Sequence, residues 1–314
     1  MELKDIKRRT WLYAAYKRLQ QLIVTRHPVE ATVHYYQKHM KKPLNLDNPR
    51  DLNEKIQWLK LFSDTSQWSL LADKLRVRDY IQALGLGHLL NRLYGVWDTP
   101  DEIDFDTLPD KFVMKTNNGC HDAVIVNDKS QIDPSAIRNK MKVSLNRHFG
   151  VSSVELHYLK IEPKIIAEEL LEDSSVGGFS RSLVDYKLWC FNGKPFGFYV
   201  TYDRATETTH HLSDFYDLEW HQHTEWMADK SPRHPIPQPK HLDIMIEAGA
   251  RLSKGYPEMR VDFYDIDGQI YIGELTMSGT SGCIRKLSPE TLLMMGQKCD
   301  ISREMALAAE RKAV

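Results

Sequence analysis

The chain has 314 residues, of which 42% are apolar and 27% charged, and its formal net charge is −1. At roughly 100–200 residues per domain, this length predicts two or three lobes, and the balanced charge argues against a nucleic-acid-binding protein. The four cysteines are scattered and form no C-x-x-C pair, which argues against a zinc ribbon or a disulfide framework. Such cysteine usage is typical of a reducing cytosol.

Residues 1–42 are strongly basic, with ten Lys/Arg against three Asp/Glu. Within them, the stretch WLYAAYKRLQQLIV (11–24) has apolar residues at helical spacing. It could form a basic amphipathic helix that rests on an anionic membrane surface or an acidic glycan. It could equally pack its apolar stripe on the body of the protein, and we favour this second interpretation because most amphipathic helices face a core.

No apolar run approaches the ~20 residues needed to cross a bilayer, and no signal-peptide-like segment stands near the start. We therefore expect a cytoplasmic protein, with contact to the inner face of the cell membrane as an open alternative through residues 1–42.

The first ~100 residues are predicted to be mainly helical. Apolar spacing indicates one helix over 53–61, with Pro49 and Asp51 near its start, and another over 70–84, closed by Gly85 and Gly87. Residues 101–110 form an acidic connector.

Beyond this connector the pattern changes to strands, which are expected at 111–115, 123–126, 164–171, 185–191 and 195–203. Helices are expected around 134–148 and 241–254, a proline-rich loop over 228–240, and a helix in the final tail. Helices first and strands later, without regular βαβ alternation, predict an α+β protein.

The segment KFVMKTNNGCHDAVIV (111–126) reads as a strand ending in Lys115, a turn containing Asn118 and Gly119, and a returning strand. Asn-Gly is a common hairpin turn, and a lysine at a strand end is usually solvated. A turn with exposed backbone N–H groups beside an ammonium can also cover phosphates. The segment is not a Walker A sequence.

Two further strands carry charged residues at their ends. Glu168 and Glu169 close the apolar strand 164–171, so one of them must point toward the protein. A strand-to-linker hinge there could present a carboxylate and a backbone N–H to a nucleotide base, or it could simply enter solvent. Asp185 and Lys187 share one face of their strand, which suits a ribose and a phosphate or a plain cross-strand ion pair.

The segment RVDFYDIDGQIYIGELT (260–276) is a hairpin with acids on it. A two-residue turn would place Asp262 opposite Gly273, with Glu274 on the other face. A three-residue turn, with Gly268 in the left-handed region, would pair Asp262 with Ile272. We predict this second register because it places four polar residues on one face, namely Arg260, Asp262, Glu274 and Thr276. Two carboxylates and a hydroxyl on rigid strands suit Mg²⁺.

Two other motifs could suggest a metal site. Asp265 and Asp267 form a D-x-D triplet of the kind found in metal-dependent glycosyltransferases, but such triplets are frequent by chance. The histidines at His210, His211, His221 and His223 lack the Cys or H-E-x-x-H context of a zinc site, so we expect them to be solvated loop residues.

Taken in order, these motifs resemble the ATP-grasp superfamily. They are most similar to the TupA-like ATP-grasp proteins, which are encoded among genes for teichuronopeptide, capsule and other bacterial surface polysaccharides. The resemblance covers roughly residues 45–280 and rests on the stretches at 48–62, 71–81, 101–119, 165–173, 185–195 and 260–276. It implies an ATP-grasp fold with a helical region over 1–105 and two subdomains, 106–172 and 173–314, that clasp ATP between antiparallel sheets.

The resemblance also implies roles for individual residues. The ATP contacts implied are Lys74, Lys115, Asn118, Gly119, Glu168, Glu169, Leu170, Leu171 and Asp185. Asp262, Glu274 and Thr276 would hold Mg²⁺, while Arg260, Arg204 and Lys187 would contact phosphate or substrate. Two departures stand out: Thr276 replaces an asparagine common in the superfamily, and the covering loop reads NNGCHD instead of a glycine- and serine-rich sequence.

The implied activity is an ATP- and Mg²⁺-dependent ligase that joins a carboxylate to an amine through an acylphosphate. The substrates would be a sugar carboxylate or an amino acid of a surface polysaccharide, and nucleic acid is not an expected partner. Two alternatives are a metal-dependent glycosyltransferase and a glycan-binding protein with a degenerate ATP site. The sequence does not indicate an oligomeric state.

Overall fold

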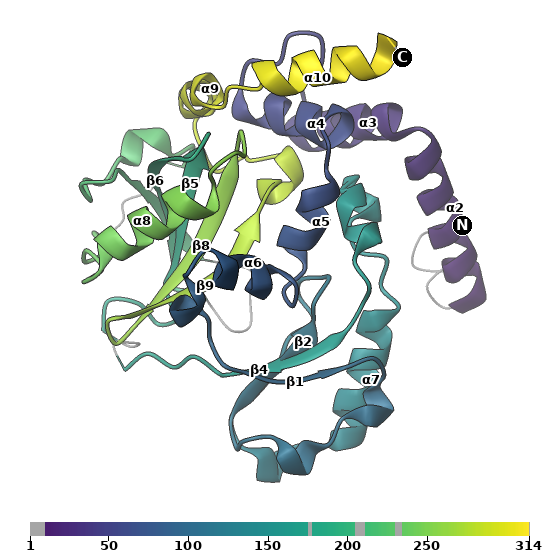
Figure 1. Ribbon diagram of the computed structural model, residues 1–314, viewed down its shortest axis with the longest axis vertical. Coiled ribbons are helices and arrows are strands. Elements are labelled where there is room, and N and C mark those ends of the chain that lie inside the picture. Colours follow the sequence, from purple (N-terminus) through teal and green to yellow (C-terminus); the bar gives the residue numbers. More distant parts are fainter. Residues whose placement is uncertain (1–9, 175–177, 205–210, 230–233, 314) are drawn as a thin grey trace.

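The computed structural model describes residues 10–174, 178–204, 211–229 and 234–313. The chain begins with helices and continues into two separate antiparallel sheets, each covered by helices (Figure 1). The α+β class expected from the sequence is therefore confirmed. Among the described residues, no helix has the length and apolar character needed to cross a membrane.

In the described part of the chain, five α-helices precede the strands. They are α2 (Thr10–Arg26), α3 (Pro28–Met40), α4 (Leu52–Phe62), α5 (Ser66–Ala72) and α6 (Val77–Ala83). The start of α4 is fixed by a capping box, in which the Asp51 side chain accepts from the Glu54 N–H and the Glu54 side chain accepts from the Asp51 N–H.

The helix predicted over 70–84 is wrong, because the chain breaks between α5 and α6. The Asp73 carboxylate accepts hydrogen bonds from the backbone N–H groups of Leu75 (2.9 Å) and Arg76 (3.3 Å). An aspartate that binds nearby backbone in this way competes with the helical ladder. The break leaves Lys74 outside both helices, and its N–H donates to the Asn117 carbonyl at 3.0 Å.

The smaller sheet has the order β1-β4-β2-β3. Its strands are β1 (Leu93–Trp97), β2 (Phe112–Thr116), β3 (Val124–Val126) and β4 (Ile165–Glu168). One face packs with α7 (Pro134–Leu145) around Phe112, Met114 and Ile165. The alternating burial of β2 leaves Val113 and Lys115 on the opposite face.

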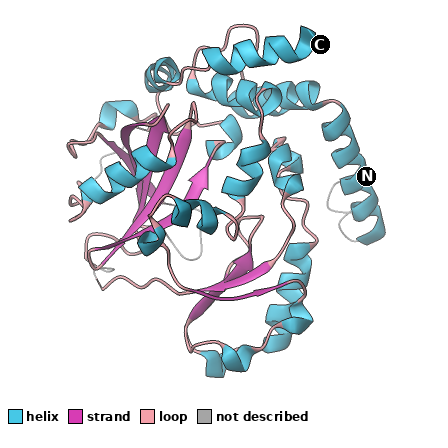
Figure 2. Ribbon diagram, in the orientation of Figure 1, coloured by secondary structure: helices cyan, strands magenta, loops and turns pink. Residues whose placement is uncertain are grey.

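The larger sheet has the order β7-β6-β5-β8-β9. Its strands are β5 (Asp185–Phe191), β6 (Lys194–Tyr202), β7 (Leu212–Tyr216), β8 (Met259–Ile266) and β9 (Gln269–Thr276). The helices α8 (Leu242–Leu252) and α9 (Pro289–Lys298) pack into the same apolar core as α4, α5 and α6, while α10 (Ser302–Ala313) crosses the top of the molecule near α4 (Figures 1 and 2).

Two strands escaped the sequence prediction. β1 contains Gly95 at an irregularity in its register, and β7 is a five-residue edge strand that carries Asp214. Short edge strands with glycine or acids lack the apolar alternation that makes a strand visible in sequence.

The predicted register of the β8–β9 hairpin is also wrong, because it assumed a three-residue turn. The turn has two residues, Asp267 and Gly268, with φ values of 51° and 86°, as a type I′ turn requires. A register shift between Asp262 and Phe263 then leaves Gly273 as the extra residue of a bulge. Beyond the bulge, Asp262 pairs with Glu274 and Arg260 with Thr276, so these four residues share one face as predicted.

The helix α2 forms where the sequence predicted it, but the described part of its apolar stripe does not pack on the body as we favoured. Among its described side chains, Val24 is buried, whereas Tyr16, Leu19, Leu22 and Ile23 are exposed.

Candidate active site

A cavity of about 470 Å³ lies between the two sheets, and α5 and α6 form part of its wall. Both the cavity-facing side of β2–β4 and the strands β5, β8 and β9 contribute to it. The predicted residues that line it are Lys74, Lys115, Glu168, Glu169, Leu170, Leu171, Asp185, Lys187, Arg204, Asp262 and Glu274. Four others, Asn118, Gly119, Arg260 and Thr276, lie outside its lining.

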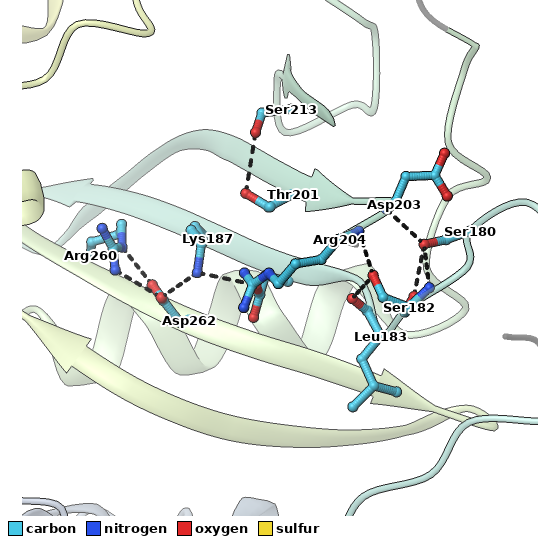
Figure 3. A network of polar contacts seen from close by, with 11 residues as sticks. Ser180, Ser182, Leu183, Lys187, Thr201, Asp203, Arg204, Ser213, Arg260 and Asp262 are labelled. Carbon is cyan, nitrogen blue, oxygen red and sulfur yellow. Dashed lines mark hydrogen bonds and ion pairs between the residues drawn. The ribbon is translucent and has the colours of Figure 1, made fainter. Parts of the chain in front are cut away.

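Asp262 is buried and bound by two cations at one end of the cavity (Figure 3). The Arg260 guanidinium donates to it twice, from Nε at 2.6 Å and from Nη2 at 2.8 Å. The Lys187 ammonium donates to it at 2.7 Å. Burial raises the pKa of the Asp262 carboxyl, but these two cations more than offset burial and hold the pKa below its usual value.

Glu274 stands opposite Asp262 in the hairpin and lines the cavity. In the part of the chain that the structure describes, no hydrogen bond or ion pair engages its carboxylate. Residues directly opposite in an antiparallel pair have Cβ atoms about 4.5–5.5 Å apart, so one cation could contact both carboxylates. Thr276 is turned toward Arg260 instead, and its hydroxyl accepts from Nη2 at 3.1 Å.

Asp185, at the start of β5, holds a second polar cluster. Its carboxylate is paired with the Arg204 guanidinium, and Lys187 lies 3.7 Å away. Arg204 is positioned by the backbone, because its N–H donates to the Ser182 hydroxyl at 2.9 Å (Figure 3). The partly buried Tyr264 side chain also hydrogen-bonds Asp185, and desolvation with this acid beside it raises the pKa of the phenol well above its usual value.

The lysines expected to contact phosphates lie on the opposite wall. Lys115 pairs with Glu168 at 2.5 Å, and Lys74 donates to the carbonyl of Gly119 in the covering loop. This loop is tied down: the Asp122 carboxylate accepts from the Thr116 N–H at 2.9 Å, and Asn117 donates to Asp73 at 2.9 Å. Side-chain hydrogen bonds therefore hold the loop beside both lysines. The loop lacks the glycine- and serine-rich sequence common in the superfamily.

The hinge after β4 connects the two sheets. The Glu169 N–H donates to the Arg92 carbonyl at 2.9 Å, and the Arg92 N–H donates to the Glu169 carboxylate at 3.1 Å. Among the described residues, nothing accepts the backbone N–H of Leu170 or Leu171. Apolar walls flank this hinge, formed by Val113 and Ile125 of the smaller sheet and by Leu183, Ile272 and Leu275 on the other side.

These residues occur in a chain that matches a known family over most of its length. The family model for TupA-like ATP-grasp proteins matches residues 54–299. The chain belongs to the TupA-like ATP-grasp family.

The chain is also similar to several solved structures, at low sequence identity. A D-alanine–D-alanine ligase from Bacillus anthracis complexed with ATP has a TM-score of 0.46 and 14% identity, over 83% of this chain and 76% of that one. An L-amino acid ligase from Bacillus licheniformis has a TM-score of 0.43 and 16% identity, over 69% of this chain and 45% of that one. The D-cycloserine synthetase DcsG has a TM-score of 0.40 and 14% identity, over 79% and 73%. No curated protein matches the chain.

Sequence reasoning missed two residues of this site in the TupA-like chain. Arg78 lines the cavity and lies 3.6 Å from the Glu168 carboxylate, and Tyr264 contacts Asp185. Arg78 falls inside LADKLRVRDYI, a stretch that carried the family resemblance, so the signal for it was present. Tyr264 shares a strand face with Asp262 and could have been found by period-two counting along β8.

The D-x-D triplet and the described histidines, the other motifs that could suggest a metal site, lie outside the cavity lining. The Asp265 carboxylate accepts from the Gly268 N–H at 2.9 Å, and Asp267 accepts from Ser174, so the D-x-D triplet shapes the hairpin turn. His221 and His223 bond the Asp217 carboxylate at 2.9 and 3.2 Å, and the ligand atoms of Asp217, Glu219 and His221 lie within 4.8 Å of one another. His210 lies outside the described residues.

Proposed function

We propose that the protein is an ATP- and Mg²⁺-dependent ligase that joins a carboxylate to an amine. The observation that carries this proposal is the pairing of Asp262 with Glu274 at one end of a cavity whose walls also hold Lys74, Lys115 and Arg204. The carboxylates there could hold a metal ion, and the cationic side chains could contact the triphosphate bound to it.

The residues present fit Mg²⁺. Glu274 has no partner of its own among the described residues, and Asp262 accepts three hydrogen bonds on two oxygens that offer about four lone-pair positions. Mg²⁺ takes one or two carboxylates and completes its shell with phosphate oxygens and water, and when bound it neutralises phosphate charge. Thr276 would support Arg260 or reach the ion through water.

The cavity also fits an adenine nucleotide. We place the base between the apolar walls near Leu170 and Leu171, whose backbone N–H groups are available, and the ribose at Asp185. The phosphates would run toward Lys74 and Lys115, beneath the loop containing Asn118 and Gly119. Glu168 and Glu169 would then orient Lys115 and the hinge, because each already binds a group there.

The reaction needs no nucleophilic side chain. A substrate carboxylate oxygen attacks the γ-phosphorus, the bond to the β-phosphate oxygen breaks, and ADP leaves. The resulting acylphosphate is attacked by an amine, and phosphate leaves as the amide forms and a proton is released. Lys187 and Arg204, which line the cavity, would offset the negative charge of the transferring group, and Arg260 would contribute from behind Asp262. The rigid strands would hold the carboxylate in line.

We further propose that the substrates are a sugar carboxylate or an amino acid used in bacterial surface polysaccharide, and that the reaction takes place in the cytoplasm, where ATP is available. Membership of the TupA-like family supports this. We propose that residues 106–172 and 173–314 act as the two clasping subdomains behind a helical region at 1–105. The smaller sheet also recruits β1, at Leu93–Trp97, from ahead of the boundary at 106.

ADP release from Mg-ATP, measured across a panel of amino acids and uronic acids, tests the proposal. We expect E274Q to lose at least about 100-fold in ADP release, because the ion loses one of its carboxylates. D265N, on the same hairpin, is the matched control and should retain activity. Unchanged turnover in E274Q would remove the metal assignment. Loss of activity in D265N together with consumption of a nucleotide sugar would favour a glycosyltransferase, and no ATP binding at all would favour a degenerate site.

A further inference from the structure

The helix α2 presents an apolar surface away from the protein. Leu19, Leu22 and Ile23 are 57%, 51% and 50% exposed, and Tyr16 is 39% exposed. An α-helix turns by about 100° per residue, so Leu19 and Leu22 lie on roughly the opposite side from Val24. These four exposed residues form one continuous arc, which we call the outer arc of α2.

Among the described residues, α2 packs against the rest of the protein through its inner side. Val24 is buried against Val151 and Val154, with Ala31 and Tyr35 of α3 beside them. The helix otherwise extends along the edge of the molecule, away from the larger sheet (Figure 1). The outer arc therefore contributes nothing to the described core, and its exposure to water is unfavourable by roughly 25 cal/mol per Å² of apolar area.

The charge of α2 is entirely positive. Residues 10–26 contain Lys17, Arg18 and Arg26 and no Asp or Glu. Arg18 and Arg26 are exposed, and Arg18 lies beside the outer arc, four residues before Leu22. Four more Lys or Arg precede the helix in the sequence, against two acids. A second copy of the chain would bring two cationic helices together, and the charge therefore disfavours self-association through this arc.

From this geometry we infer that α2 is a peripheral membrane helix that lies in the surface of an anionic lipid bilayer. The outer arc enters the boundary between headgroups and acyl chains, and Arg18 and Arg26 contact lipid phosphates. An apolar arc flanked by cations, on a helix too polar to cross a bilayer, is the pattern of such helices. Tyr16, with an apolar ring and a polar hydroxyl, suits the interface itself.

Vesicle co-sedimentation of the full chain tests this inference. The probes are vesicles of phosphatidylcholine alone and vesicles of phosphatidylcholine mixed with phosphatidylglycerol. We expect binding to the anionic vesicles, weakened by salt because exposed charges are screened. L19E should lower the partition constant at least about tenfold, and R18E severalfold, since each basic residue near the surface contributes about 1 kcal/mol.

Matched controls come from α7. V143E places the same charge at an apolar side chain that is 74% exposed, and K142E reverses an exposed charge; both should bind like the wild type. All four variants should keep the thermal midpoint of the wild type, because each change lies on the surface. Absence of wild-type binding, equal binding to both vesicle types, or an L19E variant that binds normally would overturn the inference. So would a dimer in solution that L19E dissociates, because the arc would then serve a second copy.

Discussion

Asp262 and Glu274 lie directly opposite each other on β8 and β9, although the two-residue turn at Asp267 and Gly268 alone would pair Asp262 with Gly273. The bulge at Gly273 adds one residue to β9 and changes the register beyond it. A bulge that re-aims side chains next to a site is a common use of this irregularity. The juxtaposition of the two carboxylates therefore depends on one glycine in the middle of a strand.

Replacement of that glycine should disturb both stability and the site. A Cβ atom at position 273 would lie 2.7 Å from Cε2 of Tyr264, which is closer than van der Waals contact allows. We expect G273A to lower the free energy of unfolding by about 1–3 kcal/mol, as overpacking does. Urea denaturation measures this change. The double variant G273A/Y264A should lose less stability than the sum of its single variants, and strict additivity would contradict the proposed clash.

The two cations on Asp262 should differ in their importance. R260M removes two of its three hydrogen bonds and leaves a buried carboxylate with only Lys187, which should cost about 3–5 kcal/mol at neutral pH. K187M should cost less, because Arg260 stays in place.

The pKa of Asp262 is held below its usual value, so its contribution to stability is present above that value and is lost as the pH falls through the folded-state pKa. The difference between R260M and wild type should shrink in acid, and a constant difference down to acidic pH would contradict this account.

Glu258 predicts a second dependence of stability on pH, with the opposite sign. Burial raises the pKa of its carboxyl from 4.5 to about 7, although Trp189 donates to it at 2.9 Å and Arg260 is near. Folding therefore favours the protonated acid, and stability falls as the pH rises from about 4.5 to 7. E258Q should be more stable than the wild type above pH 7, by up to roughly 3 kcal/mol, and should lose this advantage near pH 5. Thermal unfolding at both pH values checks the crossover.

Arg78 is expected to support ATP binding from the helical region. It lines the cavity, lies 3.6 Å from Glu168 and donates to Asn91 at 3.0 Å. R78M should weaken ATP binding about tenfold, because Glu168 and Lys115 lose a fixed neighbour. Calorimetric titration with Mg-ATP measures this. K111M is the matched control, since Lys111 pairs with Glu172 on an exposed surface and should bind ATP normally. Equal affinity in R78M and wild type would remove Arg78 from the site.

The sequence by itself determined which segments carry the polar residues of the candidate site. Period-two alternation placed Asp185 and Lys187 on one strand face and put Asp262 on the polar side of a hairpin, because side-chain direction in a strand follows from local geometry. Capping and glycine signals located α4 and the end of α6. The strands β2, β5 and β6 were predicted within one residue, since their apolar patterns are strong.

Only the tertiary structure decided where these segments break, how they pair and which way they face. The break at Asp73 combines local bonds to Leu75 and Arg76 with a bond from Asn117, 44 residues away. The register of the hairpin depends on a bulge packed against Tyr264. The direction of the outer arc of α2 depends on which side Val151 and Val154 occupy. Each outcome involves side-chain contacts whose free energies outweigh local preference and leave no periodic trace in the chain.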